Sequence, residues 1–216
     1  MQKLKAFTLA EILITMGIVG VIAALTVPDL VSDYQNKAMA VKARKSFNEI
    51  EEALDLMLTD EGKNTLRTSS LYTRDDGVAY FATHYLKTIS SANGFSTDEY
   101  YPLEERKAQE AKGDDEHAIS ATKPEKFSCD GSTYVLADST AICLSLNSSI
   151  TGGLKITMDT NGKEPPNTGG RDMFSFIINN NATIIKSKEQ SENCHYQPFG
   201  GGCIPRLMEN NWKMDY

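Results

Sequence analysis

The sequence predicts an α+β fold in which one long N-terminal helix packs on a small antiparallel sheet. Residues 7–27 are almost continuously apolar, and residues 28–60 carry apolar side chains at helical spacing. Short β-branched segments separated by Asp, Asn, Ser and Gly follow after residue 130. A helix with one apolar stripe and a sheet with one apolar face can cover each other, which is the usual α+β arrangement.

The N-terminal apolar run is long enough to cross a membrane, because a helix over residues 7–27 spans about 30 Å. Two lysines precede it and favour a cytoplasmic start. A secretory signal peptide has a similar basic start, and Ala23 and Ala24 are small enough for its cleavage. Neither a signal peptide nor a plain anchor accounts for Glu11, because a carboxylate in lipid loses its hydration. We therefore expect Glu11 to have a cationic partner.

The opening segment resembles the class III signal of type IV pilins and of the pseudopilins of type II secretion. In that family a basic leader ends in a small residue, usually Gly, followed by Phe, Thr, Leu, any residue, Glu and an apolar run. The chain matches this pattern from Lys5 to Glu11, with Ala6 in place of the usual glycine. The resemblance implies that a prepilin peptidase cleaves between Ala6 and Phe7 and N-methylates Phe7. It also implies a pilin-like fold.

Cleavage would create an amine on Phe7, and this amine on a neighbouring subunit could supply the cation for Glu11. Attraction in a low dielectric is strong, but desolvation of both groups offsets much of it. We therefore interpret the pair as setting the axial register of assembled subunits, because a wrong offset leaves a buried charge unpaired. Gly17 and Gly20 would allow neighbouring helices to approach closely.

Pro28 ends the apolar run, where the family also has a proline, and it predicts a kink or local melting at residues 26–29. The helical pattern continues to Asp60, where Asp, Glu and Gly form a stop signal. The predicted parts are a leader (1–6), a transmembrane assembly helix (7–27), its amphipathic continuation (28–60), a helix and loop connection (61–127) and a sheet head with a disulfide-closed C-terminal loop (128–216).

The head is expected to contain one further helix and several hairpins. The helix is predicted over residues 75–90, with Asp75 or Asp76 as its cap. Residues 99–117 are charged, which is typical of an exposed loop or a solvated helix. Strands are predicted at 133–137, 141–146, 154–158, 173–178 and 183–186, with turns at 138–140 and 179–181.

Four cysteines follow the apolar run and allow three pairings. We predict the local pairing, Cys129 with Cys143 and Cys194 with Cys203, because it closes short loops, although spacing alone does not fix connectivity. A zinc site that includes His195 is the alternative. It lacks close spacing such as Cys-x-x-Cys, and an exported head lies where disulfides form. The second loop also resembles the C-terminal disulfide region of pilins.

The loop 159–172 has the most metal-like composition in the chain. Asp159, Asn161 and Asp172 offer the oxygen ligands that calcium takes, and some major pseudopilins bind calcium in a loop of their sheet. The spacing does not fit an EF-hand. A hairpin connection held by Asx turns is the interpretation we prefer, and no other cofactor is expected.

Charge and motif content favour a structural role. The formal charge of −7 argues against nucleic acid as a partner of the whole chain. We interpret the basic patch as a solvated helix face or a counterpart of acidic residues on a neighbouring subunit. No catalytic arrangement is suggested by the three scattered histidines, so we expect no enzyme. The patch comprises Lys37, Lys42, Arg44 and Lys45, and the histidines are His84, His117 and His195.

These inferences predict a structural subunit of a type IV pilus-like filament or of a type II secretion pseudopilus. It would cross the bacterial inner membrane once, with its head in the periplasm, before assembly into a periplasmic pseudopilus or an extracellular pilus. Expected partners are further copies of the chain, other pilin-like subunits, the prepilin peptidase and an inner-membrane assembly platform. The alternatives are a minor pilin that binds DNA or a surface, and a monomeric anchored envelope protein.

Overall fold

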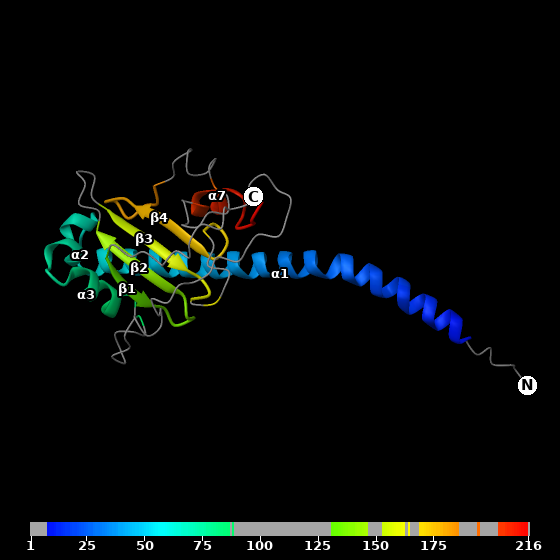
Figure 1. Cartoon of the computed structure of the whole chain (residues 1–216). Helices are drawn as coiled ribbons and strands as arrows, with labels where there is room; N and C mark the ends of the chain where they lie inside the picture. The colour runs from blue at the N-terminus through cyan, green and yellow to red at the C-terminus, as the bar shows by residue number, and fades with distance from the viewer. Residues whose placement is uncertain are drawn as a thin grey trace, which may run out of the picture. The chain divides into compact units, whose positions relative to one another are not determined.

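The computed structural model describes residues 8–86, 88, 131–146, 153–162, 164, 169–185, 194 and 203–215. The predicted cleavage residues Ala6 and Phe7, the charged segment 99–117 and Cys129 lie outside these residues. The chain forms two compact units, Met1–Ala38 and Met39–Tyr216. The predicted α+β class is confirmed, with one long N-terminal helix and a four-stranded antiparallel sheet (Figure 1).

Helix α1 runs from Leu9 to Asp60 and ends at the predicted stop. Gly62 adopts φ +62°, a left-handed conformation that glycine reaches without a Cβ clash. The amide of Gly62 donates to the Thr59 carbonyl (3.2 Å) and that of Lys63 to the Leu58 carbonyl (2.8 Å). This pair of bonds is a Schellman motif, which satisfies carbonyls that the helix end would leave without donors.

The sheet is an antiparallel meander in the order β1-β2-β3-β4. Its strands are β1 (Ser132–Val135), β2 (Ala141–Leu146), β3 (Leu154–Asp159) and β4 (Met173–Ile178). Cross-strand register places apolar residues in rows on one face, because alternate residues of a strand share a face. The rows are Ile142, Met158 and Phe174, then Leu144, Ile156 and Phe176, then Leu146, Leu154 and Ile178.

The core of the second unit joins these rows to the later turns of α1. Phe47 is 1% exposed, and its ring centroid lies 5.4 Å from that of Phe176 on β4 and 5.7 Å from that of Trp212. The later part of the predicted apolar stripe is therefore buried in this core, whereas its earlier residues Leu30, Val31, Tyr34 and Val41 are exposed. The other buried α1 residues of this core are Ala43, Ile50, Ala53, Leu54 and Met57.

The predicted fifth strand at 183–186 is wrong for the residues described there. Ile184 makes an isolated bridge with Ile178 but belongs to no strand. The Asn179 Oδ1 atom accepts bonds from the amides of Asn181 (2.9 Å) and Thr183 (3.1 Å). The Thr183 amide is thus used by the Asn179 side chain and not by a strand ladder, although the Ile185 amide still donates to the Ile177 carbonyl (2.8 Å).

Short helices connect α1 to the sheet: η1 (Leu66–Thr68), α2 (Ser70–Thr73) and α3 (Gly77–His84). Helix α3 is shorter than predicted. Asp76 occupies the N-cap position, but its side chain caps nothing, because the carboxylate binds Arg74 Nε (2.8 Å) and Nη2 (3.0 Å). A Cβ at Gly77 would collide with the backbone carbonyls of Ser70 and Leu71, so the α2–α3 contact requires glycine.

Candidate functional site

The start of α1 is fixed by a reciprocal pair of side chains, Thr8 and Glu11. The Glu11 Oε2 atom accepts bonds from the Thr8 amide (2.8 Å) and the Thr8 hydroxyl (2.9 Å), and the Glu11 amide donates to Thr8 Oγ1 (3.3 Å). This is a capping box, in which two amide donors at the helix start are satisfied by side chains. Our sequence reasoning missed this role, although Thr-x-x-Glu before an apolar run is its sequence signature.

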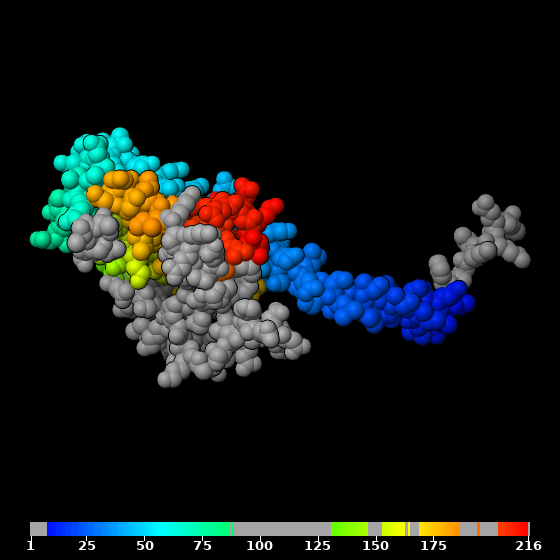
Figure 2. Space-filling model, turned by 90° about the horizontal axis from the view of Figure 1, so that it is seen from above, coloured from blue at the N-terminus to red at the C-terminus, as the bar shows by residue number. Residues whose placement is uncertain are grey.

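The first turns of α1 expose a large apolar surface. Among the described residues, α1 is the one helix long and apolar enough to cross a membrane, and its most apolar window is 0% buried. Figure 2 draws this segment in blue. Exposed apolar area of this size requires lipid, other apolar helices or removal as a signal. The exposed residues include Leu9, Leu13, Ile14, Met16, Ile18, Val19, Val21, Ile22 and Leu25.

The polar groups of this segment are satisfied inside the helix. Thr15 Oγ1 donates to the Ile12 carbonyl and Thr26 Oγ1 to the Ile22 carbonyl, both at 3.0 Å. Hydroxyls bonded in this way add no unsatisfied donor to an apolar environment. Glu11 is the sole charged residue between Leu9 and Val27.

Gly17 and Gly20 leave open space on α1, because a Cβ at either would meet no atom within 4 Å. Such small residues let another helix backbone approach closely. The helix is continuous through Pro28, so local melting is not observed, and a kink there stays a prediction.

The C-terminal disulfide joins Cys194 to Cys203, as the local pairing predicted. Cys143 is disulfide-bonded as well. Because the sulfurs of Cys194 and Cys203 are bonded to each other, they do not form the zinc site that we considered. His195 lies outside the described residues.

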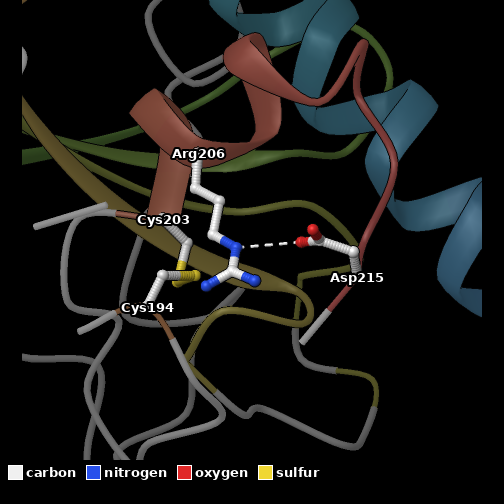
Figure 3. The surroundings of a disulfide bond; sticks show 4 residues. All are labelled: Cys194, Cys203, Arg206 and Asp215. Atoms are coloured by element: carbon white, nitrogen blue, oxygen red, sulfur yellow. Dashed lines mark hydrogen bonds and ion pairs between the residues drawn. A yellow bond between two sulfur atoms is a disulfide. The ribbon is translucent and has the colours of Figure 1, made fainter. Parts of the chain in front are cut away.

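Cys203 begins α7 (Cys203–Glu209), a helix that the sequence reasoning did not predict. Ile204 and Leu207 of this helix are fully buried in the core. Figure 3 shows Arg206 reaching from α7 toward Asp215, with Arg206 Nε 2.9 Å from Asp215 Oδ1. The Arg206 guanidinium holds the pKa of the Asp215 carboxyl below its usual range. The C-terminal segment is thus attached to the head by a disulfide, buried side chains and an ion pair.

Of the predicted calcium residues, Asp159 is the last residue of β3, and Asn161 and Asp172 lie in the connection between β3 and β4. Asp159 and Asp172 are both fully buried. The Asn161 amide donates to Asp159 Oδ1 (3.3 Å), and Thr160 donates to the Asp172 carbonyl from its amide (2.9 Å) and its hydroxyl (3.1 Å). The first of these bonds is an Asx turn, as in the interpretation that we preferred, and the other two join the ends of the connection. The described residues contain no group of three His, Cys, Asp or Glu residues able to hold a metal, and calcium binding stays a prediction.

One residue of the basic patch, Lys45, forms an ion pair within the head. Lys45 Nζ lies 3.0 Å from Asp138 Oδ2, in the turn between β1 and β2. Burial raises the pKa of the Asp138 carboxyl, but the hydrogen bonds from Lys45 and Thr140 outweigh it, so the pKa lies below its usual range. The next residue of α1, Ser46, also contacts this turn, because its hydroxyl lies 3.2 Å from the Thr140 hydroxyl.

His84 is the one histidine that the structure describes. His84 Nδ1 lies 2.9 Å from Thr83 Oγ1 and 3.2 Å from the Tyr80 carbonyl, and its ring stacks on that of Tyr80 at 4.0 Å. His117 and His195 lie outside the described residues, and the absence of enzyme activity stays a prediction.

The fold and its exposed helix define a class of architecture. A long apolar N-terminal helix is followed by a four-stranded antiparallel sheet, which is a pilin-like arrangement. No protein family, curated protein or solved structure matches the chain. The apolar helix is consistent with membrane anchoring or with a signal sequence.

Proposed function

We propose that the chain is a structural subunit of a pilus-like filament or of a secretion pseudopilus. In this proposal the prepilin peptidase removes residues 1–6 and methylates Phe7, and the apolar part of α1 anchors the subunit in the bacterial inner membrane. An assembly platform in that membrane then transfers it into a filament of pilin-like subunits. The observation that carries the proposal is that one uninterrupted helix combines an uncovered apolar surface with a face buried under the sheet.

The physical argument concerns where the apolar surface goes after the subunit leaves the membrane. An α1 segment with bare Ile, Leu and Val side chains is stable in lipid, and it stays stable outside lipid only if other apolar surfaces cover it. Identical helices packed side by side would supply that cover. Gly17 and Gly20, with open space around them, support such packing.

Glu11 has two roles in this proposal. Within its own chain the carboxylate accepts the Thr8 amide and hydroxyl, and in a filament it would also meet the Phe7 amine of a neighbour. These roles separate chemically, because a glutamine side chain can take part in a capping box but carries no charge. With a neutral amide at position 11, subunits that pack at a wrong axial offset would not bury an unpaired charge, so the wrong offset would no longer be penalised.

The test compares full-length Glu11→Gln with Glu11→Ala in cells that assemble the wild-type chain into filaments. We expect Glu11→Gln to keep the start of the helix and to lose filament assembly, and Glu11→Ala to lose both. Sheared filaments are quantified by immunoblotting, and helix content is measured by circular dichroism in detergent. Filaments of Glu11→Gln at the wild-type level would show that the charge does not set the register.

Processing is tested on the same material. Mass spectrometry of the purified protein should show loss of residues 1–6 and one added methyl group on Phe7. A protein that retains its leader, or one cleaved near Ala23, would contradict the proposal.

A further inference from the structure

The last described residues of the chain, 212–215, return from the end of α7 to the core of the head, and we call them the strap. Their side chains alternate in burial. Trp212 and Met214 are half-buried and pack against the core, whereas Lys213 and Asp215 are exposed. The strap therefore has one apolar side, which lies on the head, and one polar side, which faces water.

The turn that leads from α7 into the strap is strained. Two successive residues have left-handed backbone, Asn211 with φ +51° and Trp212 with φ +59°. Asparagine tolerates this conformation, but a bulky side chain rarely adopts it, because its Cβ comes too close to the backbone. The turn is closed by the Trp212 amide, which donates to the Leu207 carbonyl, and by Asn210 Nδ2, which donates to the Lys213 carbonyl (3.0 Å). Such strain persists only where other contacts hold it.

Two contacts hold the strap in this conformation. The Trp212 ring lies 5.7 Å from the ring of Phe47 on α1. Asp215 Oδ1 lies 2.9 Å from Arg206 Nε on α7 (Figure 3). We call Phe47 and Arg206 the seat of the strap. The seat binds one aromatic ring and one carboxylate, both supplied by the strap.

The seat is built by elements that do not include the strap. Phe47 belongs to the part of α1 that is buried under the sheet. Arg206 belongs to α7, which is fixed by the disulfide of Cys203 and by the fully buried Ile204 and Leu207. The seat therefore keeps its form whichever strap fills it, including the strap of a second copy.

A second copy would offer the seat the same groups. Its Trp212 ring and Asp215 carboxylate would make the same contacts that the chain makes with itself. Only the turn would differ, because it would extend and release the left-handed conformation of Asn211 and Trp212. Strained, short hinges favour the exchange of identical elements between copies for this reason. Four residues span at most about 14 Å, so the two heads would lie directly side by side.

We propose that two copies of the chain exchange their straps, so that Trp212 of each copy packs on Phe47 of the other and Asp215 pairs with the other copy's Arg206. Reciprocal exchange closes the pair about a twofold axis. The ring contact supplies most of the attraction, since exposed ion pairs contribute little. The exchange involves only the head and requires no filament, so it goes beyond the proposed function.

Exchange is measured by photocrosslinking of the full-length chain in detergent. A benzophenone amino acid at position 212 should crosslink to the tryptic peptide 46–63, which contains Phe47. Chains grown on ordinary and on heavy nitrogen are mixed and incubated just below the melting temperature before irradiation. We expect crosslinks that join a light peptide to a heavy one. If every crosslink to peptide 46–63 joins peptides of the same label, each strap stays on its own head and the proposal is wrong.

Two hinge variants test the role of strain. Asn211→Gly should lower the share of mixed crosslinks about threefold, because glycine adopts left-handed backbone without a Cβ clash and stabilises the closed turn. Deletion of Asn211 should raise that share, because the shortened turn no longer brings Trp212 back to Phe47 of its own chain. Melting followed by circular dichroism shows that each variant is folded.

Ser139→Gly is the matched control. Ser139 is exposed in the turn between β1 and β2 and has φ +70°, so glycine relieves the same kind of strain away from the strap. It should leave the share of mixed crosslinks unchanged. If a folded Asn211→Gly behaves like this control, or if the folded deletion variant shows no increase, strain in the hinge does not drive exchange. Mixed crosslinks that map only outside peptide 46–63 would mean that copies associate through another surface, which also overturns the proposal.

Discussion

Replacement of Phe47 by alanine should destabilise the head by about 4 kcal/mol. Phe47 is 1% exposed and lies between Phe176 and Trp212. Burial of a side chain of this size contributes about 1.5–3 kcal/mol. Each of its two ring pairs adds about 0.5–1.5 kcal/mol. The expected loss lies within the range of about 3–5 kcal/mol for buried Phe→Ala changes.

The assay is guanidinium unfolding of the full chain in detergent, followed by the fluorescence of Trp212. The chain contains one tryptophan, so the signal comes from a ring 5.7 Å from the substituted side chain. For a head of this size the melting temperature should fall by about 8–16 °C. Because the stability of a domain is only about 5–15 kcal/mol, a loss of about 4 kcal/mol should also lower the guanidinium midpoint clearly.

Val41→Ala is the matched control, because Val41 lies on the same helix and is 65% exposed. It should change the free energy of unfolding by less than about 0.5 kcal/mol. A loss below about 1 kcal/mol for Phe47→Ala, similar to that of the control, would refute the packing of α1 on the sheet.

Three further variants test contacts that stabilise the head. Replacement of Cys194 and Cys203 by alanine should cost about 2–3 kcal/mol in guanidinium unfolding, because the disulfide closes a nine-residue separation in the unfolded chain; equal midpoints for the wild-type chain with and without reductant would contradict this. Tyr72→Phe should lower the free energy of unfolding, measured by thermal denaturation, by about 1–3 kcal/mol. The Tyr72 hydroxyl donates to the Gly153 carbonyl (2.5 Å) and accepts from the Gly153 amide (2.7 Å), so its removal leaves both backbone groups without this partner. Asp138→Asn should lower the free energy of unfolding at pH 7, and its effect should diminish below about pH 4. The Asp138 carboxyl has a lowered pKa in the fold, so it stabilises the fold above its unfolded pKa and loses that contribution as the pH falls through its folded pKa. A difference between variant and wild type that does not change with pH would show that the Asp138 charge does not stabilise the head.

The sequence predicted most elements of the head, because local patterns specified them. Strands β2 and β4 have the predicted bounds, since β-branched and aromatic residues alternate between clear turn signals. The stop of α1 at Asp60 followed from Gly62. The prediction of a fifth strand was wrong because the Asn179 side chain accepts the amides of Asn181 and Thr183. The alternation of apolar and polar residues does not reveal such side-chain bonds to the backbone.

The candidate site was predicted in part. Glu11 was identified because a carboxylate in an apolar run is costly, but its bonds to Thr8 were not predicted, although Thr-x-x-Glu before an apolar run is the signature of a capping box. The helix α7 was missed, because its short apolar sequence is stabilised by burial of Ile204 and Leu207 rather than by a strong helical pattern.

The sequence by itself determined the α+β class, the apolar N-terminal helix and the isolated acid within it. These depend on periodicity and hydrophobicity, which each segment carries locally. Only the tertiary structure decided which side of α1 the sheet covers, that Lys45 pairs with Asp138, and that Lys42 and Glu52 remain exposed. Those outcomes depend on how distant segments pack, because a side chain becomes buried or exposed only when another element covers it or leaves it bare.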